Sequence, residues 1–153
     1  MLSPAEILDE RCILLDMQAR KKKDVIANLV ESLASTGFIE NPRKVTKLVL
    51  DREKSASTGI GHGAAIPHWL SPDMDKTVMA FGRTTAEIPF GAIDGKPVRL
   101  FCLIVGPSNR PNDHLQLLSR LSRILRHDEC IEALLAAQQK EEIRKIFSRE
   151  ESV

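Results

Sequence analysis

Apolar residues recur at helical spacing in two stretches of the N-terminal half of the chain. The first stretch predicts a helix over residues 20–35 that Gly37 ends, with its apolar face formed by Val25, Ile26, Leu29, Val30 and Leu33. The second follows the cap signal Asn41-Pro42 and predicts a helix that runs to about Lys54, with Val45, Leu48 and Val49 on one face. Each stretch is therefore expected to pack one side against a core.

Further helical patterns lie at the two ends of the chain. Residues 3–6, Ser-Pro-Ala-Glu, form a capping-box pattern with proline at the first helical position, and they predict a short helix through about Asp9. Near the C-terminus a longer helix is predicted from a stripe of residues, namely His114, Leu117, Leu118, Leu121 and Leu125. Two more helices are expected over residues 129–137 and 140–147.

Strand patterns occupy the middle of the chain. Residues 78–84 and 88–90 have strand-like composition, and the Asp-Gly-Lys-Pro sequence at 94–97 predicts a tight turn before the next strand. Residues 98–105 are almost continuously apolar, which is typical of a central strand covered on both faces. A shorter apolar run at 12–17 predicts an edge strand. Because helices bracket the strands, we expect an α/β fold with a mixed β-sheet flanked by helices on both sides.

Size and composition narrow the class of protein. The chain has 153 residues, so we expect one domain over residues 1–153. Apolar residues make up 42%, charged residues 28% and the net charge is +1, which lacks the positive excess typical of nucleic-acid binding. Three separated cysteines, Cys12, Cys102 and Cys130, are typical of free thiols in a reducing cytosol. With no visible signal peptide and no apolar run of membrane length, the sequence predicts a cytoplasmic protein that does not insert into membranes.

The segment of residues 57–68 is the most unusual part of the chain. It has glycine at every second position from 59 to 63 and then reads Ile66-Pro67-His68. Glycine weakens the interior of helices and strands alike, so this spacing indicates a pliable loop whose backbone a ligand or a second chain can approach closely. Pro67 fixes its own φ and biases Ile66 toward extended geometry, so His68 is held stiffly at the end of that loop. This arrangement suits a nucleophile or a ligand.

Three further residues would give His68 the surroundings of an anion site. His114 falls in the first turn of its helix, where unpaired N–H groups favour an anion, and Arg52 lies in the last turn of the helix that leads into the glycine segment. Neutral imidazole is a competent nucleophile toward phosphorus, because its ordinary pKa is about 6.5. Transfer of a phosphoryl group then needs positioning and charge stabilisation, which His114, Arg52 and the Thr58 hydroxyl are predicted to supply. Two alternatives stay open: His114 as a partly buried histidine bound by its preceding loop, and Arg52 as a complement to the helix dipole.

Other chemistries have weaker signals. The glycine segment lacks Gly-Lys-Ser/Thr, and it follows a helix rather than a strand, so neither a P-loop nor a dinucleotide site is expected. The histidines do not show zinc-site spacing, and no serine stands in a nucleophile-elbow context. We therefore expect no metal and no cofactor, and we expect His62 and His127 to be surface residues.

Several separated motifs occur in an order that can be compared with known families. They are Arg52-Glu53, residues 57–61, residues 65–68, residues 93–98 and His114-Leu115. Together they resemble the enzyme IIA domains of the fructose/mannitol class (EIIA type 2) of the bacterial phosphoenolpyruvate-dependent sugar phosphotransferase system. The resemblance covers nearly the whole chain and implies the mannitol/fructose-type enzyme IIA fold.

The resemblance also implies a role for each candidate residue. In that family the histidine of the Ile-Pro-His motif accepts a phosphoryl group on Nε2 from the phosphocarrier protein HPr, and this position is His68. The family's second active-site histidine, in a His-Leu pair, corresponds to His114, and its arginine at a helix end corresponds to Arg52. The chain would then be a phosphotransferase component with a phosphohistidine intermediate.

The chain looks most like the free-standing, nitrogen-regulatory branch of the class. That likeness implies a phosphocarrier with a regulatory output, in which phosphate on His68 changes the charge of a docking face for target proteins. Two alternatives stay open: a sugar-transport IIA component that passes the phosphoryl group to a separate IIB protein, and a binding module that is never phosphorylated.

Two features fall outside the family pattern or its known chemistry. Trp69 stands where the family favours glycine or another small residue, and its ring is expected to narrow the pocket beside His68 or to contact a partner. The basic run of residues 20–23 is interpreted as a solvated first helical turn, with a docking patch for an acidic partner as the alternative.

Overall fold

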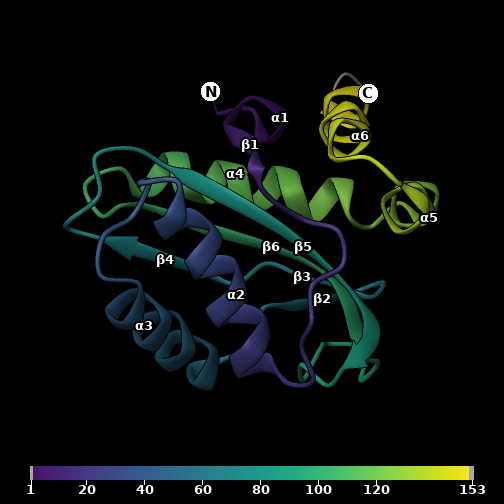
Figure 1. Ribbon diagram of the computed structural model, residues 1–153, viewed down its shortest axis with the longest axis horizontal. Coiled ribbons are helices and arrows are strands. Elements are labelled where there is room, and N and C mark those ends of the chain that lie inside the picture. The colour runs from purple at the N-terminus through teal and green to yellow at the C-terminus, as the bar shows by residue number, and fades with distance from the viewer. Residues whose placement is uncertain (1, 152–153) are drawn as a thin grey trace.

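The strands form one mixed sheet with helices packed on both of its faces (Figure 1). The computed structural model describes residues 2–151, and within them the sheet has six strands in the order β1-β5-β6-β3-β2, with β4 also paired to β6. The strands are β1 Leu8–Leu14, β2 Gly59–Gly61, β3 Ala64–Ala65, β4 His68–Ser71, β5 Val78–Ile88 and β6 Val98–Pro107. The predicted α/β class with a mixed sheet is confirmed.

Strand β6 lies at the centre of the sheet and sets the position of β4. It pairs antiparallel with β5 along one edge and parallel with both β3 and β4 along the other. The register places Ala64 opposite Leu100 and His68 opposite Ile104, so β3 and β4 follow one another along the same edge of β6. His68 is the first residue of β4 and is therefore fixed to the most central strand of the fold.

Helices cover the two faces of the sheet in two groups. The helices α2 (Lys22–Ser35) and α3 (Pro42–Ser55) lie on one face, and α4 (Pro111–Ile124), α5 (Asp128–Ala136) and α6 (Lys140–Glu151) lie on the other (Figure 1). The short helix α1 (Pro4–Ile7) packs beside α6. None of the helices within residues 2–151 combines the length and the apolar character that crossing a bilayer requires.

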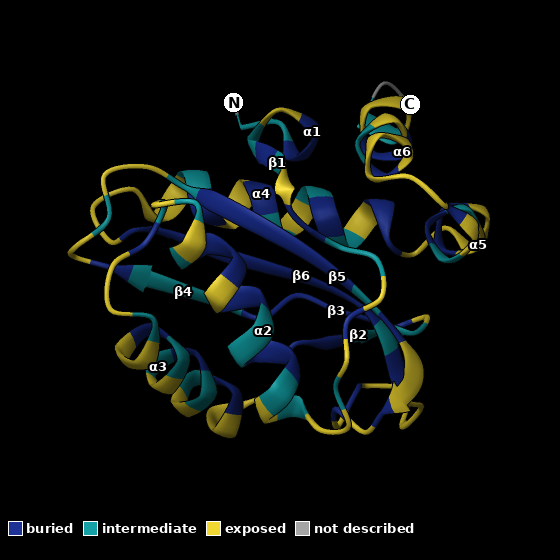
Figure 2. Cartoon of the chain, in the orientation of Figure 1, coloured by how far each residue is buried: buried dark blue, intermediate teal, exposed yellow. Residues whose placement is uncertain are grey.

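The core is split into two layers by the alternation of side chains along the sheet. Leu100, Cys102 and Ile104 of β6 pack with α4, α5 and α6, whereas the intervening Phe101, Leu103 and Val105 pack with α2 and α3. Both faces of β6 are therefore buried, as Figure 2 shows for the centre of the sheet. This explains the continuous apolar sequence of the strand, because it has no face that meets water.

The predicted helices are present, with corrections at the end of α1 and at the N-terminal cap of α3. The helix expected to run through about Asp9 ends at Ile7, because β1 already begins at Leu8, although Ser3 caps it as predicted by accepting the Glu6 N–H at 3.3 Å. Asn41 was expected to cap α3 with its side chain. Instead it adopts a left-handed φ of 52°, and within the described part of the chain its side chain makes no capping hydrogen bond.

The strands differ from expectation in extent. The edge strand expected at 12–17 runs over Leu8–Leu14, and the two runs at 78–84 and 88–90 form a single strand, β5, with an irregular register between Arg83 and Ile88. The glycine segment is not a pliable loop. It is a short antiparallel pair, β2 and β3, whose turn uses positive φ angles at Gly61 (90°), His62 (56°) and Gly63 (77°).

Candidate functional site

The first component of the site is His68, which a single hydrogen bond orients. Its Nδ1 lies 2.8 Å from the carbonyl oxygen of Ile66. A carbonyl oxygen has no proton, so Nδ1 must carry the hydrogen and donate it. In the neutral ring Nε2 then holds the lone pair, and it is the nitrogen that can attack an electrophile.

His114 lies against His68 on the same side of the sheet. The two ring centroids are 5.3 Å apart with an angle of 59° between the ring planes. His114 is in the first turn of α4 and is only 5% exposed, yet neither of its ring nitrogens has a hydrogen-bond partner within residues 2–151. A buried imidazole with two unused nitrogens is unusual, because burying a polar group without a partner costs stability. The alternative that its preceding loop binds this histidine therefore fails.

Space for the His114 ring is provided by Gly106 at the end of β6. A Cβ at this position would lie 3.3 Å from Nδ1 of His114 and 3.0 Å from Oγ1 of Thr77. A Cβ here would therefore be in tight contact with both side chains, and the His114 ring or the Thr77 side chain would have to shift. The glycine is needed here because two side chains approach its backbone closely.

Burial keeps both imidazoles neutral near pH 7. Burial lowers the pKa of His68 from its usual 6.5; the hydrogen bond to Ile66 opposes that effect, and the charge of Arg52 lowers the pKa further. Burial, and to a smaller extent His68, lowers the pKa of His114 to about 4. The pair can therefore combine a free lone pair on His68 with an N–H donor on His114.

This depressed pKa predicts how stability depends on pH. Below pH 6.5 the unfolded chain protonates His114, whereas the folded chain does so only near pH 4, so folding becomes weaker as pH falls through this window. We expect wild-type protein to lose about 2 kcal/mol of unfolding free energy from this residue between pH 7 and pH 4.5. Urea denaturation at several pH values measures the loss, and His114→Gln should make the dependence shallower. An unchanged pH dependence in the variant would contradict the assignment.

Arg52 lies in the last turn of α3, as predicted. Its Nη1 donates a hydrogen bond to the carbonyl oxygen of Ala56 at 3.1 Å, which holds the guanidinium at the end of the helix. Its positive charge lowers the pKa of His68. The structure thus brings His68 and His114 together from β4 and α4, and Arg52 acts on His68 through its charge.

Thr58 is placed differently from its predicted role. It is 7% exposed, and its hydroxyl donates to the carboxylate of Glu53, which also accepts the Thr58 backbone N–H at 3.2 and 3.3 Å. The hydroxyl proton is therefore already engaged, and we withdraw the prediction that it binds the phosphoryl group. Glu53 was not predicted as a site residue. The sequence held a signal for this residue, because a glutamate on the side of a helix that faces the protein core is rarely buried without a partner.

Trp69 does not narrow the His68 pocket. Successive residues of a strand point to opposite faces, and Trp69 pairs with Val105, whose side chain packs with α2 and α3. His68 instead pairs with Ile104, whose side chain packs with α4. Of the other histidines, His62 is exposed and its Nδ1 lies 3.3 Å from Oδ1 of Asp128, and His127 is exposed at the start of α5, as expected for surface residues.

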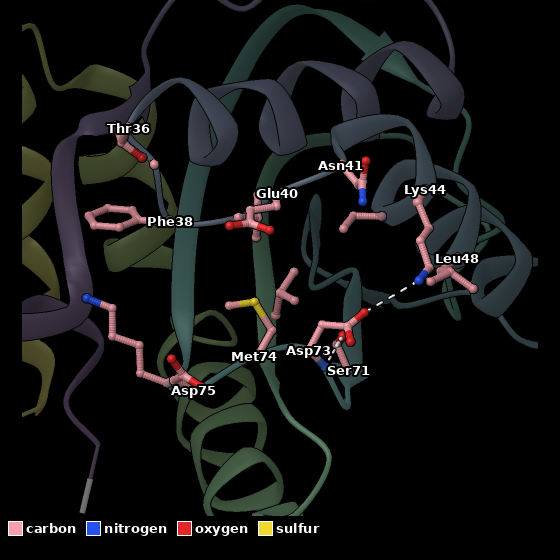
Figure 3. Close-up of a pocket in the computed structure, with 15 residues that line it drawn as sticks. Thr36, Phe38, Glu40, Asn41, Lys44, Leu48, Ser71, Asp73, Met74 and Asp75 are labelled. Carbon is pink, nitrogen blue, oxygen red and sulfur yellow. Dashed lines mark hydrogen bonds and ion pairs between the residues drawn. The ribbon is translucent and has the colours of Figure 1, made fainter.

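A cavity of about 850 Å³ lies near the far end of β4 (Figure 3). Its lining comes from the α2–α3 connection, from α3 and from the β4–β5 turn, and includes neither of the paired histidines nor Arg52. Lys44 and Asp73 pair across it at 3.4 Å, and Ser71 accepts the Asp73 N–H at 3.1 Å. Two charged groups at this cavity, Lys44 and Asp73, thus bind one another, and the candidate site is elsewhere. As for metals, the described residues contain no group of three or more potential ligands, so the expected absence of a metal stays a prediction.

Comparison with known families identifies the class of protein that this fold and site define. A family model described as "Phosphoenolpyruvate-dependent sugar phosphotransferase system, EIIA 2" matches residues 6–150. The chain therefore belongs to the EIIA type 2 family and is a component of a phosphotransferase system.

Relatives within this family have two kinds of name. The fructose-specific EIIA component of Haloferax volcanii is 32% identical over 96% of this chain and 92% of its own length. The nitrogen regulatory protein of Bradyrhizobium diazoefficiens is 32% identical over 94% of this chain and 93% of its own length. The fructose-specific EIIABC component of Bacillus subtilis is 33% identical over 94% of this chain, but this chain spans only 23% of its length.

Solved structures agree with this assignment. The crystal structure of the nitrogen regulatory protein IIA-Ntr from Neisseria meningitidis has a TM-score of 0.88 and 34% identity, covering 94% of this chain and 97% of that one. The complex of enzyme IIA and phosphorylated enzyme IIB for mannitol from Escherichia coli matches with a TM-score of 0.75 and 25% identity, covering 91% and 95%. The predicted mannitol/fructose-type IIA fold is therefore confirmed.

Proposed function

We propose that this protein is a phosphocarrier that accepts a phosphoryl group on Nε2 of His68 from an HPr-type protein. The observation that carries the proposal is the hydrogen bond from His68 Nδ1 to the Ile66 carbonyl, at 2.8 Å. It assigns the hydrogen to Nδ1 and leaves the lone pair on Nε2, so the ring needs no rearrangement before it attacks. Membership in a phosphotransferase family supplies the electrophile.

The step is a transfer between two nitrogen atoms. The P–N bond of the donor's phosphohistidine breaks and its electron pair returns to the donor ring, while the lone pair of His68 Nε2 forms the new P–N bond. The charge on the phosphoryl oxygens needs donors that are already in place. We assign this role to the unpaired N–H of His114 and to the guanidinium of Arg52.

The donor must reach the site as a protein, and the surface around His114 supports this. Leu115, the next residue of α4, is 64% exposed, although large apolar side chains of this chain are otherwise mostly buried. We propose that this end of α4 contacts the HPr-type donor. We further propose that the chain acts as one domain in the cytoplasm, where its three buried free thiols are stable.

For the output we favour regulation of other proteins. The nitrogen regulatory relatives match this chain and are matched by it over nearly their whole length. A phosphate on His68 would add negative charge to the half-buried start of β4, and it would change partner affinity without refolding. The second candidate is sugar transport through a separate IIB protein, which the fructose-specific relatives and the mannitol IIA–IIB complex favour.

The test is phosphorylation of the wild-type chain with phosphoenolpyruvate, enzyme I and HPr. We expect one phosphate in the intact mass that is stable in alkali and lost in acid, and a phosphorus–nitrogen NMR correlation to Nε2 of His68. Absence of phosphate with two active donor pairs, including one specific to nitrogen-regulatory systems, would overturn the proposal. It would leave the binding module as the remaining alternative.

A second measurement separates the two outputs. The phosphorylated chain is mixed with a fructose- or mannitol-type IIB protein and the corresponding sugar permease. Retention of the phosphate supports the regulatory output. Loss of the phosphate that depends on the sugar supports the transport role and contradicts the regulatory output.

A further inference from the structure

We propose that Lys22, Glu53 and Thr58 are positioning residues that hold the Ile66 carbonyl in place and thereby fix the ring tautomer of His68. We call these three residues the Glu53 network. The inference rests on the proposed function for its purpose, because tautomer control matters only if Nε2 is the acceptor. None of the three is assigned contact with the phosphoryl group.

Glu53 is the centre of the network and is held by three donors. Its side chain is only 1% exposed, although it is ionisable. Lys22 donates from Nζ to Oε2 at 3.1 Å, and Thr58 donates both its backbone N–H and its hydroxyl to the carboxylate. Burying a carboxylate is costly unless it is paired and hydrogen-bonded, and these three donors meet that requirement.

The network continues from Thr58 to His68 through the backbone. The carbonyl oxygen of Thr58 accepts the N–H of Ile66 at 3.1 Å. The carbonyl oxygen of Ile66 accepts Nδ1–H of His68 at 2.8 Å. Thr58 is thus bound to Glu53 on one side and to Ile66 on the other, so displacing Thr58 displaces the acceptor of the His68 proton.

Lys22 differs from the rest of the basic run at residues 20–23. Arg20, Lys21 and Lys23 are exposed, whereas the Lys22 side chain is 27% exposed and its Nζ lies 4.2 Å from the centroid of the Phe90 ring. The helix dipole disfavours a lysine at the start of a helix. Here the ion pair with Glu53 and the contact with the Phe90 ring compensate for that unfavourable interaction. The interpretation of this run as a solvated first turn is therefore wrong for Lys22.

The experiment reads the tautomer directly in the unphosphorylated protein. Ring nitrogen NMR of His68 distinguishes Nδ1–H from Nε2–H, and we compare wild type with Glu53→Gln, Lys22→Met and Thr58→Val. We expect wild type to show Nδ1–H and each variant to show a new Nε2–H population. In each of these variants the rate of phosphate acceptance should fall by about 10- to 100-fold, because small misplacements of a reacting group have effects of this size.

Matched controls and rescues exclude a general loss of structure. Asp51→Asn removes an exposed carboxylate from the same helix, and Lys23→Met removes the neighbouring exposed lysine. Both should leave the tautomer and the rate unchanged. Lys22→Arg and Thr58→Ser keep the donors, and they should restore the wild-type tautomer even if Lys22→Met or Thr58→Val folds poorly.

A double variant tests whether Lys22 acts through Glu53. In the Glu53→Gln background, Lys22→Met should have no further effect on the tautomer. Folded variants with the wild-type tautomer would overturn the inference, whatever their phosphorylation. If the tautomer shifts as expected but wild type accepts no phosphate, the proposed function fails and the positioning of His68 stands.

Discussion

Replacing His68 by glutamine is expected to abolish phosphate acceptance by this protein. The change deletes the Nε2 lone pair, and the neighbouring imidazole of His114 is only 5% exposed, with its ring centroid 5.3 Å from that of His68. We expect phosphate acceptance to fall by at least ~1,000-fold, as for loss of a covalent nucleophile. Intact-mass measurement after incubation with phosphoenolpyruvate, enzyme I and HPr gives the result directly.

The fold should survive this substitution. The hydrogen bond to Ile66 is the interaction that His68 loses, and such a bond contributes about 1 kcal/mol to stability. His62→Gln is the matched control, because His62 is an exposed histidine on the neighbouring strand pair and should keep full acceptance. Phosphate that persists in His68→Gln and disappears in His114→Gln would move the acceptor to His114 and contradict the assignment.

Much of the fold could be predicted because its signals are local. The apolar positions of α4 recur at the spacing of a helix. The continuous apolar sequence of β6 is typical of a strand that is covered on both faces. Errors arose where tertiary pairing decides the outcome. The glycine segment looked like a loop because glycine disfavours strands, but pairing with β6 makes a strand of Ala64–Ala65.

The site was predicted only in part, because some of its residues have local sequence signals and others do not. His68 and His114 stand in conspicuous local contexts, so a sequence pattern can find them, and the structure then brings their rings within 5.3 Å. The contacts of Thr58 with Glu53 and of Lys22 with Glu53 cannot be inferred from any local pattern. They join α2, α3 and the segment before β2, and only the packed sheet shows which residues meet.

The orientation of Trp69 shows how register carries information that composition lacks. Because Trp69 follows His68 in the sequence, its ring was expected to narrow the pocket beside His68 or to contact a partner. A strand places neighbours on opposite faces, so the tryptophan packs toward α3, on the face of the sheet opposite to His68. A bulky residue at this position therefore does not enter the space around the two histidines.

Replacing Arg52 by alanine should change His68 in two opposite ways. In the unphosphorylated protein the arginine charge disfavours protonated His68, so its removal should raise the pKa of His68. In the transfer proposed above, the same charge would stabilise the phosphoryl oxygens, so its removal should slow acceptance by roughly 100- to 1,000-fold. NMR titration of His68 measures the first effect, and rapid-quench kinetics with phosphorylated HPr measures the second.

The variants around Arg52 separate charge from geometry. Arg52→Lys keeps the positive charge, so the pKa of His68 should stay low. A single ammonium group cannot replace the planar guanidinium with its two parallel N–H donors, so the rate of phosphate acceptance should recover only in part. Lys54→Ala is the control, since this lysine is in the same helical turn and its side chain is 80% exposed beside Asp51. A disturbance that exposes the His68 ring would also raise its pKa, because burial lowers it, but such a disturbance would not be reversed by restoring the charge in Arg52→Lys. A slow Arg52→Ala variant whose His68 pKa does not rise would contradict the role assigned to Arg52.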